Sequence, residues 1–200
     1  MPVADDGIAM PHKPHKFGAD GDLIERLEGD KRRKRVPIED VLPRLGLAKS
    51  DSVVDLGPGT GYFTFPMSQL AGQVVGVDIE AKMLEVMKGR VADRGIENVS
   101  MIRGDMSHLP IADASVDHVF AAFVYHEVAD QAELLAECAR ILKRGGRLTV
   151  IDFRKRIESD GPPIWVRKSP AHVRKTASRW FTPISSDGPA GYYQLMFSRN

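Results

Sequence analysis

The chain has 200 residues, of which 42% are hydrophobic, and this suits one globular domain with a sizeable core. Lys and Arg total 28 against 27 for Asp and Glu, so bulk positive charge is excluded as the main means of gripping nucleic acid. A single cysteine, Cys138, excludes an internal disulfide and a cysteine-based metal cage, and no apolar run is long enough to span a membrane. The N-terminus also lacks the apolar core of a signal peptide, so we expect a soluble cytoplasmic protein without a membrane partner.

The first quarter of the chain predicts a tail followed by short helices. Residues 1–16 are rich in Pro, Gly and polar groups and predict a flexible tail. The pattern predicts an amphipathic helix over 22–27 and a further helix from Pro37 to Leu45, which ends at Gly46 as a C-cap. Between the two helices lie five adjacent cations: Lys31, Arg32, Arg33, Lys34 and Arg35. Residues 17–50 are therefore interpreted as a helical cap.

From Ser52 onward, apolar runs typical of buried strands alternate with amphipathic helices. The predicted strands are Ser52–Leu56, Val74–Asp78, Val99–Arg103, Val116–Val124 and Arg147–Phe153. The predicted helices run from Tyr62 to Leu70, from Glu80 to Arg94, and from a cap at Asp130 to Gly145-Gly146. This alternation predicts a parallel sheet with helices on both faces, in a core that we place at residues 51–153.

Residues 154–200 follow a different pattern. Ser169-Pro170 predicts a helix start, and a strand over 180–184 is followed by a turn at 187–191 and a strand over 192–198. Because the turn is short, this last pair of strands is expected to be antiparallel.

Three glycines, Gly57, Gly59 and Gly61, crowd the stretch VVDLGPGTGY. Such a loop suits a backbone that turns sharply or approaches a ligand closely, and it follows a strand at the sheet edge where open α/β folds bind ligands. Tyr62 occupies the third glycine position of the dinucleotide fingerprint, so a nicotinamide oxidoreductase is a less favoured alternative. A nucleotide-binding P-loop is excluded, because no Gly-Lys-Ser/Thr follows.

Carboxylates stand at three successive strand ends: Asp55, Asp78 and Asp105. Each has a role if the ligand is an adenosine lying across these ends. Asp78 would accept hydrogen bonds from ribose hydroxyls, Asp105 from the adenine amine with Met106 against the ring, and Asp55 would neutralise an ammonium group. The structural alternatives are that Asp78 caps the next helix and that Asp105 forms an Asx-turn with Ser107 or His108.

The segment from Val53 to Phe153 resembles a class I S-adenosylmethionine-dependent methyltransferase of the small-molecule type. The stretches that carry the resemblance are VVDLGPGTGYFT, VVGVDIE, RGDMSHLP, VDHVFAAFVYHEV and ILKRGGRLTVIDF. It implies a doubly wound, mostly parallel seven-stranded sheet with an antiparallel terminal strand, and S-adenosylmethionine as cofactor with S-adenosylhomocysteine as product. The expected cofactor contacts are Asp55, Gly57, Gly59, Gly61, Asp78, Ile79, Asp105, Met106 and Ala122.

Methyl transfer from a sulfonium is an in-line displacement, in which alignment and exclusion of water can supply most of the catalysis. Tyr125, His126 and Glu127 follow the fourth strand and are the candidates for substrate contact or for a base; His126 and Tyr125 are the catalytic hypothesis, and packing is the alternative. The helical cap and residues 154–179 would close the pocket, where Trp165 and Trp180 would contact an apolar acceptor.

We therefore expect one domain over residues 17–200 that methylates a small molecule. Two alternatives remain open: an RNA methyltransferase that binds through the cations at 31–35, and a non-catalytic S-adenosylmethionine-binding protein. The Asn-Pro-Pro-Tyr signature of amino-directed nucleic-acid methyltransferases is absent, since the matching region reads Ala-Ala-Phe-Val-Tyr. No metal site is expected, because the six histidines lack ligand spacing. The acceptor and the oligomeric state are not predicted.

Overall fold

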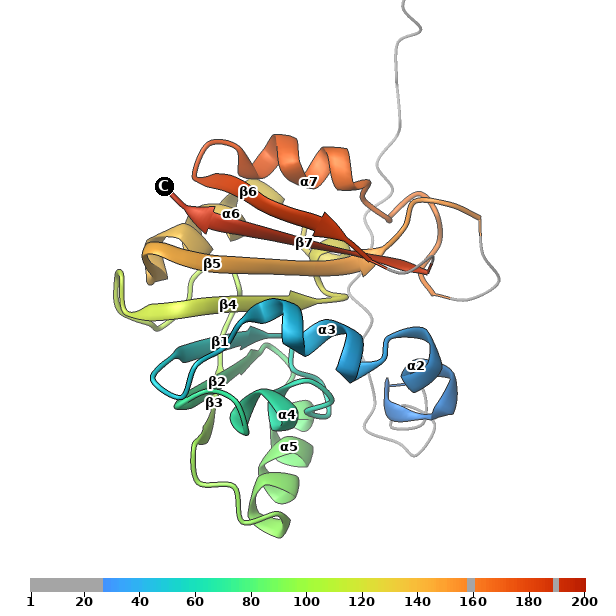
Figure 1. Ribbon diagram of the computed structural model, residues 1–200. Coiled ribbons are helices and arrows are strands. Elements are labelled where there is room, and N and C mark those ends of the chain that lie inside the picture. The colour runs from blue at the N-terminus through green and yellow to red at the C-terminus, as the bar shows by residue number, and fades with distance from the viewer. Residues whose placement is uncertain (1–26, 158–160, 189–190) are drawn as a thin grey trace, which may run out of the picture.

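The computed structural model describes residues 27–157, 161–188 and 191–200 (Figure 1). The predicted tail at 1–16, and all but the last residue of the helix predicted over 22–27, lie outside these ranges. The domain boundaries at 16, 50 and 153 therefore stay predictions.

Seven strands form one sheet in the order β3-β2-β1-β4-β5-β7-β6. Only β7 runs antiparallel to its neighbours in the described part of the chain, so the predicted seven-stranded, mostly parallel sheet with an antiparallel terminal strand is confirmed. The strands are β1 (Ser52–Leu56), β2 (Gln73–Asp78), β3 (Val99–Arg103), β4 (Val116–Ala122), β5 (Leu142–Phe153), β6 (Phe181–Asp187) and β7 (Tyr192–Arg199).

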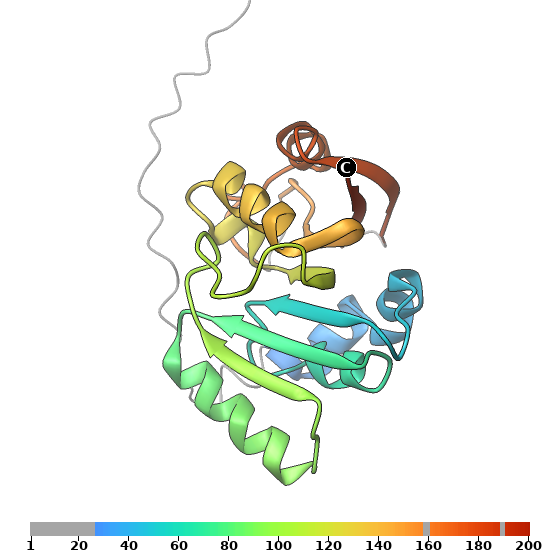
Figure 2. The same cartoon turned by 90° about the vertical axis from the view of Figure 1, so that its left-hand side faces the viewer.

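Helices cover both faces of the sheet, as Figures 1 and 2 show. They are α2 (Asp30–Arg35), α3 (Ile38–Leu45), α4 (Thr64–Ser68), α5 (Ala81–Asp93), the 3-10 helix η1 (Tyr125–Glu127), α6 (Gln131–Ile141) and α7 (Pro170–Ala177). Two apolar clusters result, one on each face, because successive side chains of a strand point to opposite sides. Val53 packs with α3, α4 and α5, whereas Val54 packs with α6 and α7.

Several helix ends follow directly from the sequence. Gly46 ends α3 in the left-handed conformation with φ +59°, which glycine adopts without steric cost. The Asp130 carboxylate accepts hydrogen bonds from the amides of Ala132 and Glu133 and so caps α6. Ser169 caps α7 in the same way, with Pro170 in the first turn.

Several predicted boundaries were wrong: α4 spans Thr64–Ser68 rather than Tyr62–Leu70, β5 begins at Leu142 rather than Arg147, and β6 extends to Asp187 rather than ending at Ile184. Helix α6 ends at Ile141 rather than at Gly145-Gly146, because Leu142 already pairs with Val116 as the first residue of β5. The register between β4 and β5 then shifts, and regular pairing resumes where Arg147 pairs with His118. Gly145 and Gly146 therefore lie in an irregular, bulged part of β5. Strand β4 ends at Ala122 rather than at Val124, because the next residue adopts a positive φ.

The strand order changes direction between β1 and β4, which lie side by side although β2 and β3 separate them in sequence. In open α/β sheets, ligands bind at such a switch point, outside the carboxyl ends of the strands. The glycine loop follows β1 there, and η1 follows β4. Helix α2 lies beyond the same edge (Figure 1).

Candidate functional site

The glycine loop has left-handed backbone at all three of its glycines, with φ of +63° at Gly57, +57° at Gly59 and +92° at Gly61. A Cβ atom on Gly57 would lie 2.4 Å from the Val124 Cγ1 atom and 3.2 Å from Met106 Cε. A Cβ atom on Gly59 would have Leu27 Cδ1 as its nearest neighbour, at 3.6 Å. The loop is therefore shaped by three positions whose backbone conformation disfavours any side chain, and at Gly57 a neighbouring side chain already occupies the space a Cβ atom would need.

Asp55 and Asp78 lie buried on either side of this loop, with 2% and 8% of their surfaces exposed. Thr64 Oγ1 donates a hydrogen bond of 2.6 Å to Asp55 Oδ2, yet burial, with a contribution from the Asp78 charge, raises the pKa of Asp55 to about 7. Burial also raises the pKa of Asp78, although hydrogen bonds from backbone amides, among them that of Gly59, oppose the rise. Two buried carboxylates that repel each other make a favourable place for a cation.

The carboxylate of Asp78 accepts a hydrogen bond of 2.9 Å from the Glu80 amide, so it also performs the capping role that was the structural alternative. Its neighbour Ile79 is 54% exposed and presents an apolar surface beside this carboxylate. Asp105 is exposed and accepts a hydrogen bond of 2.9 Å from the Ser107 amide, which is the predicted Asx-turn. Asp78 and Asp105 can each accept further bonds, because a carboxylate offers about four lone-pair directions.

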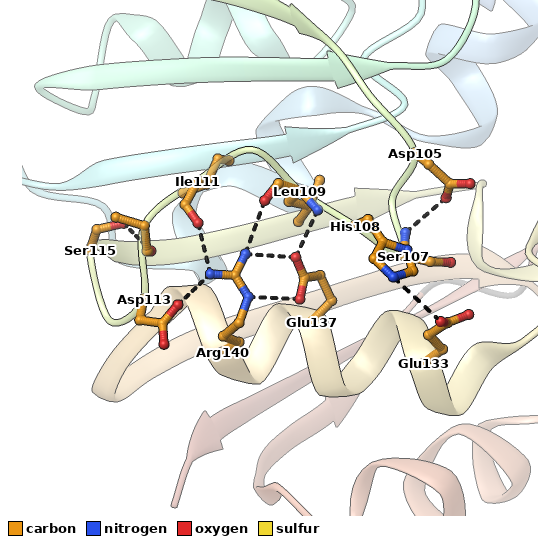
Figure 3. Close-up of polar contacts among 11 residues, drawn as sticks. Asp105, Ser107, His108, Leu109, Ile111, Asp113, Ser115, Glu133, Glu137 and Arg140 are labelled. Carbon is orange, nitrogen blue, oxygen red and sulfur yellow. Dashed lines mark hydrogen bonds and ion pairs between the residues drawn. The ribbon is translucent and has the colours of Figure 1, made fainter.

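A charged clamp on α6 holds the segment that follows Asp105 (Figure 3). Arg140 donates to the backbone oxygens of Leu109 (3.0 Å) and Ile111 (2.8 Å) and pairs with Asp113 and Glu137. Glu137 in turn accepts a hydrogen bond of 2.7 Å from the Leu109 amide. The clamp fixes the loop between β3 and β4, on which the predicted adenine contacts lie.

His126 and Asp152 form a buried pair at the ends of β4 and β5. The His126 ring Nδ1 lies 2.8 Å from Asp152 Oδ1, and the His126 amide donates to Asp152 Oδ2 at 3.0 Å. Burial alone lowers the pKa of His126, but the hydrogen bond and charge of Asp152, with the charge of Glu127, outweigh it and raise the pKa. Glu127 Oε1 lies 3.8 Å from Nε2, on the other side of the ring.

The other catalytic candidate, Tyr125, is fully buried in the core cluster that includes α6 and α7. Burial raises the pKa of its phenol to about 12, so its placement favours packing over proton transfer. Between β4 and this residue, Phe123 adopts a φ of +62°, which is strained for a bulky side chain. This turn redirects the chain and presents His126 to Asp152.

Two of the five cations at 31–35 face aromatic rings. The Arg32 guanidinium lies 3.9 Å from the centroid of the Phe123 ring, and that of Arg35 lies 4.9 Å from the centroid of Phe153. Both arginines are half-buried, and the rings that they face belong to the residue after β4 and to the last residue of β5. Lys31, Arg33 and Lys34 are more peripheral and lie over no aromatic ring among the described contacts.

The two tryptophans lie at opposite edges of the sheet. Trp165 follows β5 at the carboxyl edge and is 74% exposed. Trp180 precedes β6, whose first residue pairs with Arg199, at the edge where β5 begins. The predicted contact of Trp180 with the acceptor was therefore wrong, because strand direction places it away from the glycine loop.

Four of the predicted residues lie close enough for their charges to interact. Besides burial, the charge of Asp78 raises the pKa of both Asp55 and Glu127, and the charge of His126 lowers the pKa of Glu127. Ala122 is the last residue of β4, next to them. The sequence interpretation missed Asp152 and the clamp of Glu137 and Arg140. Asp152 had a usable signal, because it lies near the end of a strand, as the three predicted aspartates do.

Within the described ranges, no group of His, Cys, Asp and Glu side chains could hold a metal ion. Of the helices in that part of the chain, none combines the length and apolarity that crossing a bilayer requires.

Comparisons with known proteins agree with this geometry. A family model described as a methyltransferase domain matches residues 54–150. The chain is 38% identical over 116 residues to the ubiquinone/menaquinone biosynthesis C-methyltransferase UbiE of Haemophilus ducreyi, covering 56% of this chain and 45% of that protein. It is 34% identical over 162 residues to the same-named protein of Cellvibrio japonicus, covering 78% of this chain and 64% of the relative.

The fold is also known from solved structures. The crystal structure of an S-adenosylmethionine-dependent methyltransferase from Aquifex aeolicus superposes with a TM-score of 0.83 at 24% identity, over 90% of this chain and 99% of that one. The chain spans about half the length of the first curated relatives it matches.

Proposed function

We propose that this chain is a class I S-adenosylmethionine-dependent methyltransferase that transfers the methyl group to a small organic acceptor bound beside His126. The methyltransferase-domain model over residues 54–150, the similarity to named methyltransferases and the fold support this proposal. The observation that carries the proposal is the pair of buried carboxylates, Asp55 and Asp78, on either side of the glycine loop. Each has a raised pKa, and a bound cation would relieve their repulsion.

The residues present fit the methyl donor. Asp78 would accept the ribose hydroxyls, exposed Ile79 would cover one face of the adenine, and Asp105 with Met106 would contact its edge and other face. Asp55 would face the ammonium group. Gly57, Gly59 and Gly61 supply the left-handed backbone of the turn, and Ala122 at the end of β4 would leave room for the donor because its side chain is small.

Bound S-adenosylmethionine supplies an electrophilic methyl group and a neutral thioether as leaving group. The chain then has to align the acceptor, exclude water and, where the nucleophile carries a proton, remove it. Because Asp152 faces Nδ1, the hydrogen of a neutral imidazole stays on Nδ1, and Nε2 is available to take a proton. His126 would then act as the base, with Glu127 beside Nε2 stabilising the imidazolium.

The acceptor side is aromatic and cationic at once. Phe123 packs edge-to-face on Phe153, with ring centroids 4.7 Å apart, and Arg32 and Arg35 lie over the two rings. Such a wall suits a planar acceptor. The relatives are named as C-methyltransferases of ubiquinone/menaquinone biosynthesis, so acceptors from that chemistry are the first class to test.

Calorimetric titration with S-adenosylhomocysteine tests the donor site. We expect saturable binding by the wild type and binding weaker by about 10–100-fold for Asp78→Ala, the loss of a charged hydrogen bond. Asp93→Ala, at the exposed C-terminal end of α5, is the matched control and should bind normally. Absence of saturable binding by folded wild-type protein would overturn the proposal, and binding without turnover of any acceptor would favour the non-catalytic alternative.

A further inference from the structure

Two large apolar side chains on the segment after β5 face solvent: Ile157 is 89% exposed and Trp165 is 74% exposed. The other exposed large apolar side chains in the described ranges are Leu70, Ile79 and Ile184, which belong to three different parts of the chain. Single exposed apolar residues are ordinary, but two large ones on the segment after one strand, one of them an indole, are typical of an interaction surface.

The exposure of Trp165 belongs to a built loop. Arg167 is 2% exposed, and its guanidinium donates to the backbone oxygens of Pro162 (2.7 Å), Arg154 (3.2 Å) and Arg156 (3.2 Å). One buried cation thereby joins the backbone at Arg154 and Arg156 to the backbone at Pro162, while the Trp165 indole stays exposed.

Cations surround these apolar side chains. Burial and then the charges of Lys168, Lys155 and Lys175 lower the pKa of His172, so the three ammonium groups act on one face formed by the loop and α7. Residues 154–168 carry five cations, Arg154, Lys155, Arg156, Arg167 and Lys168, against the two acids Glu158 and Asp160. The face is cationic although the whole chain is nearly neutral.

We propose that this face, defined by Lys155, Ile157, Trp165, Lys168 and Lys175, docks on an anionic lipid surface. Tryptophan favours the boundary between headgroups and acyl chains, and lysines are attracted to anionic headgroups. The proposal replaces the expectation from the sequence that the protein has no membrane partner. The proposed contact is with the membrane surface, and no part of the chain is proposed to cross the bilayer.

The loop projects from the same sheet edge as the one at which β4 and β5 end (Figure 1). Docking would therefore turn the acceptor side, at Phe153 and His126, toward the lipid. If the proposed function holds, an apolar acceptor dissolved in the bilayer could reach the site without crossing water. That consequence rests on the proposed function, whereas the docking itself does not.

Flotation with lipid vesicles tests the docking on the full chain. We expect binding to vesicles of phosphatidylcholine with about one third phosphatidylglycerol, weak binding to phosphatidylcholine alone, and loss of binding as salt rises. Trp165→Ala should reduce the partition coefficient at least about tenfold, and Lys155→Gln with Lys168→Gln by about fivefold for each charge. Lys82→Gln with Lys88→Gln, two exposed lysines of α5, is the charge-matched control and should bind as the wild type does.

Fluorescence locates the contact, because the chain has only two tryptophans. In Trp180→Phe protein the single emitter is Trp165, whose emission should shift to the blue and whose quenching by acrylamide should fall when anionic vesicles are added. An unshifted Trp165, or equal binding by Trp165→Ala, overturns the proposal. Retention on RNA with a steep salt dependence, and no binding to vesicles, would also overturn it and would favour the RNA alternative. Binding of S-adenosylhomocysteine, measured separately, keeps a failure here distinct from a failure of the proposed function.

Discussion

Asp152 holds His126 at two points, since one carboxylate oxygen accepts from the backbone amide at 3.0 Å and the other lies 2.8 Å from the ring Nδ1. The aspartate is the second-to-last residue of β5, and the histidine belongs to η1, the turn after the neighbouring strand β4. The pair therefore ties the ends of β4 and β5 together and fixes which ring nitrogen carries the hydrogen. This makes Asp152 a positioning residue for any proton transfer at Nε2.

Replacing Asp152 by Asn should lower the pKa of His126 below its ordinary 6.5. Burial, which favours the neutral ring, would then be opposed only by the charge of Glu127. Titration of the histidine ring protons by NMR measures this, and the acidic limb of the pH–rate profile should move in the same direction. His118, buried near the start of β4, is the internal control and should titrate unchanged. An unchanged His126 pKa would contradict the assigned role.

The His126–Asp152 pair should also make the stability of the fold depend on pH. The pKa of His126 is raised in the folded protein, so the pair stabilises the fold below the unfolded pKa near 6.5, and this contribution is lost as the pH rises through the folded pKa. Wild-type protein should therefore lose its stability advantage over Asp152→Asn above that pH. Urea unfolding at several pH values measures the difference.

Alanine substitutions at Gly57 and Gly95 should distinguish the cost of backbone strain from the cost of steric overlap. Both have a positive φ, +63° and +60°, but a Cβ on Gly57 would lie 2.4 Å from Val124 whereas one on Gly95 would meet nothing within 4 Å. Gly95→Ala should cost about 1–2 kcal/mol of unfolding free energy, the cost of left-handed backbone alone. Gly57→Ala should cost about 2–5 kcal/mol, since steric overlap adds to it. Combining it with Val124→Ala should recover part of the difference; equal costs for the two glycines would contradict the close contact.

The sequence predicted the parts of the fold that depend on local pattern. Apolar runs bounded by glycines became β1 and β2, and the capping residues Asp130 and Ser169 begin the helices expected of them. The misplaced end of α6 had a nonlocal cause, because Leu142 leaves the helix to pair with Val116, at the start of a strand that precedes the helix. Pairing partners cannot be read from propensity alone.

The same distinction applies to the site. Asp55, Asp78 and Asp105 could be singled out from the sequence because strand ends of a parallel sheet meet at one edge, and their contacts with the donor stay predictions. The contact of Arg32 with Phe123 was not, since it joins residues far apart in sequence through a backbone conformation that phenylalanine rarely adopts. In the sequence, a run of five cations is typical of a solvated surface, whereas in the fold Arg32 and Arg35 face aromatic rings.

The clamp on α6 should be testable through Arg140. Arg140→Ala removes donors to Leu109 and Ile111 and leaves Glu137 without its cation, so we expect a loss of about 1–3 kcal/mol in unfolding free energy. Amide hydrogen exchange over residues 105–113 should accelerate more than elsewhere in the sheet. The exposed Arg144→Ala is the control of matched charge. Uniform acceleration across the sheet would show that the clamp does not act locally.

Asp55 should make stability and donor binding respond to pH in opposite directions. Its pKa is about 7 in the folded protein against an ordinary value of 3.8, so between these values the folded state holds a proton that the unfolded state has lost. By linkage, this group lowers the free energy of unfolding as the pH rises from about 4 to about 7, by an amount on the order of 2–4 kcal/mol. Asp55→Asn, which cannot ionise and keeps an oxygen for Thr64, should therefore melt at a higher temperature than the wild type at pH 8.

Donor affinity should change the other way. The ionised carboxylate attracts the ammonium group of S-adenosylhomocysteine, so the wild type should bind it more tightly at pH 8 than at pH 6, and Asp55→Asn should bind it more weakly at pH 8 with little dependence on pH. Calorimetry across this range, with thermal melts on the same samples, measures both trends. Because stability favours the neutral group and binding favours the charged one, a variant that gained both at pH 8 would show that Asp55 does not face the donor.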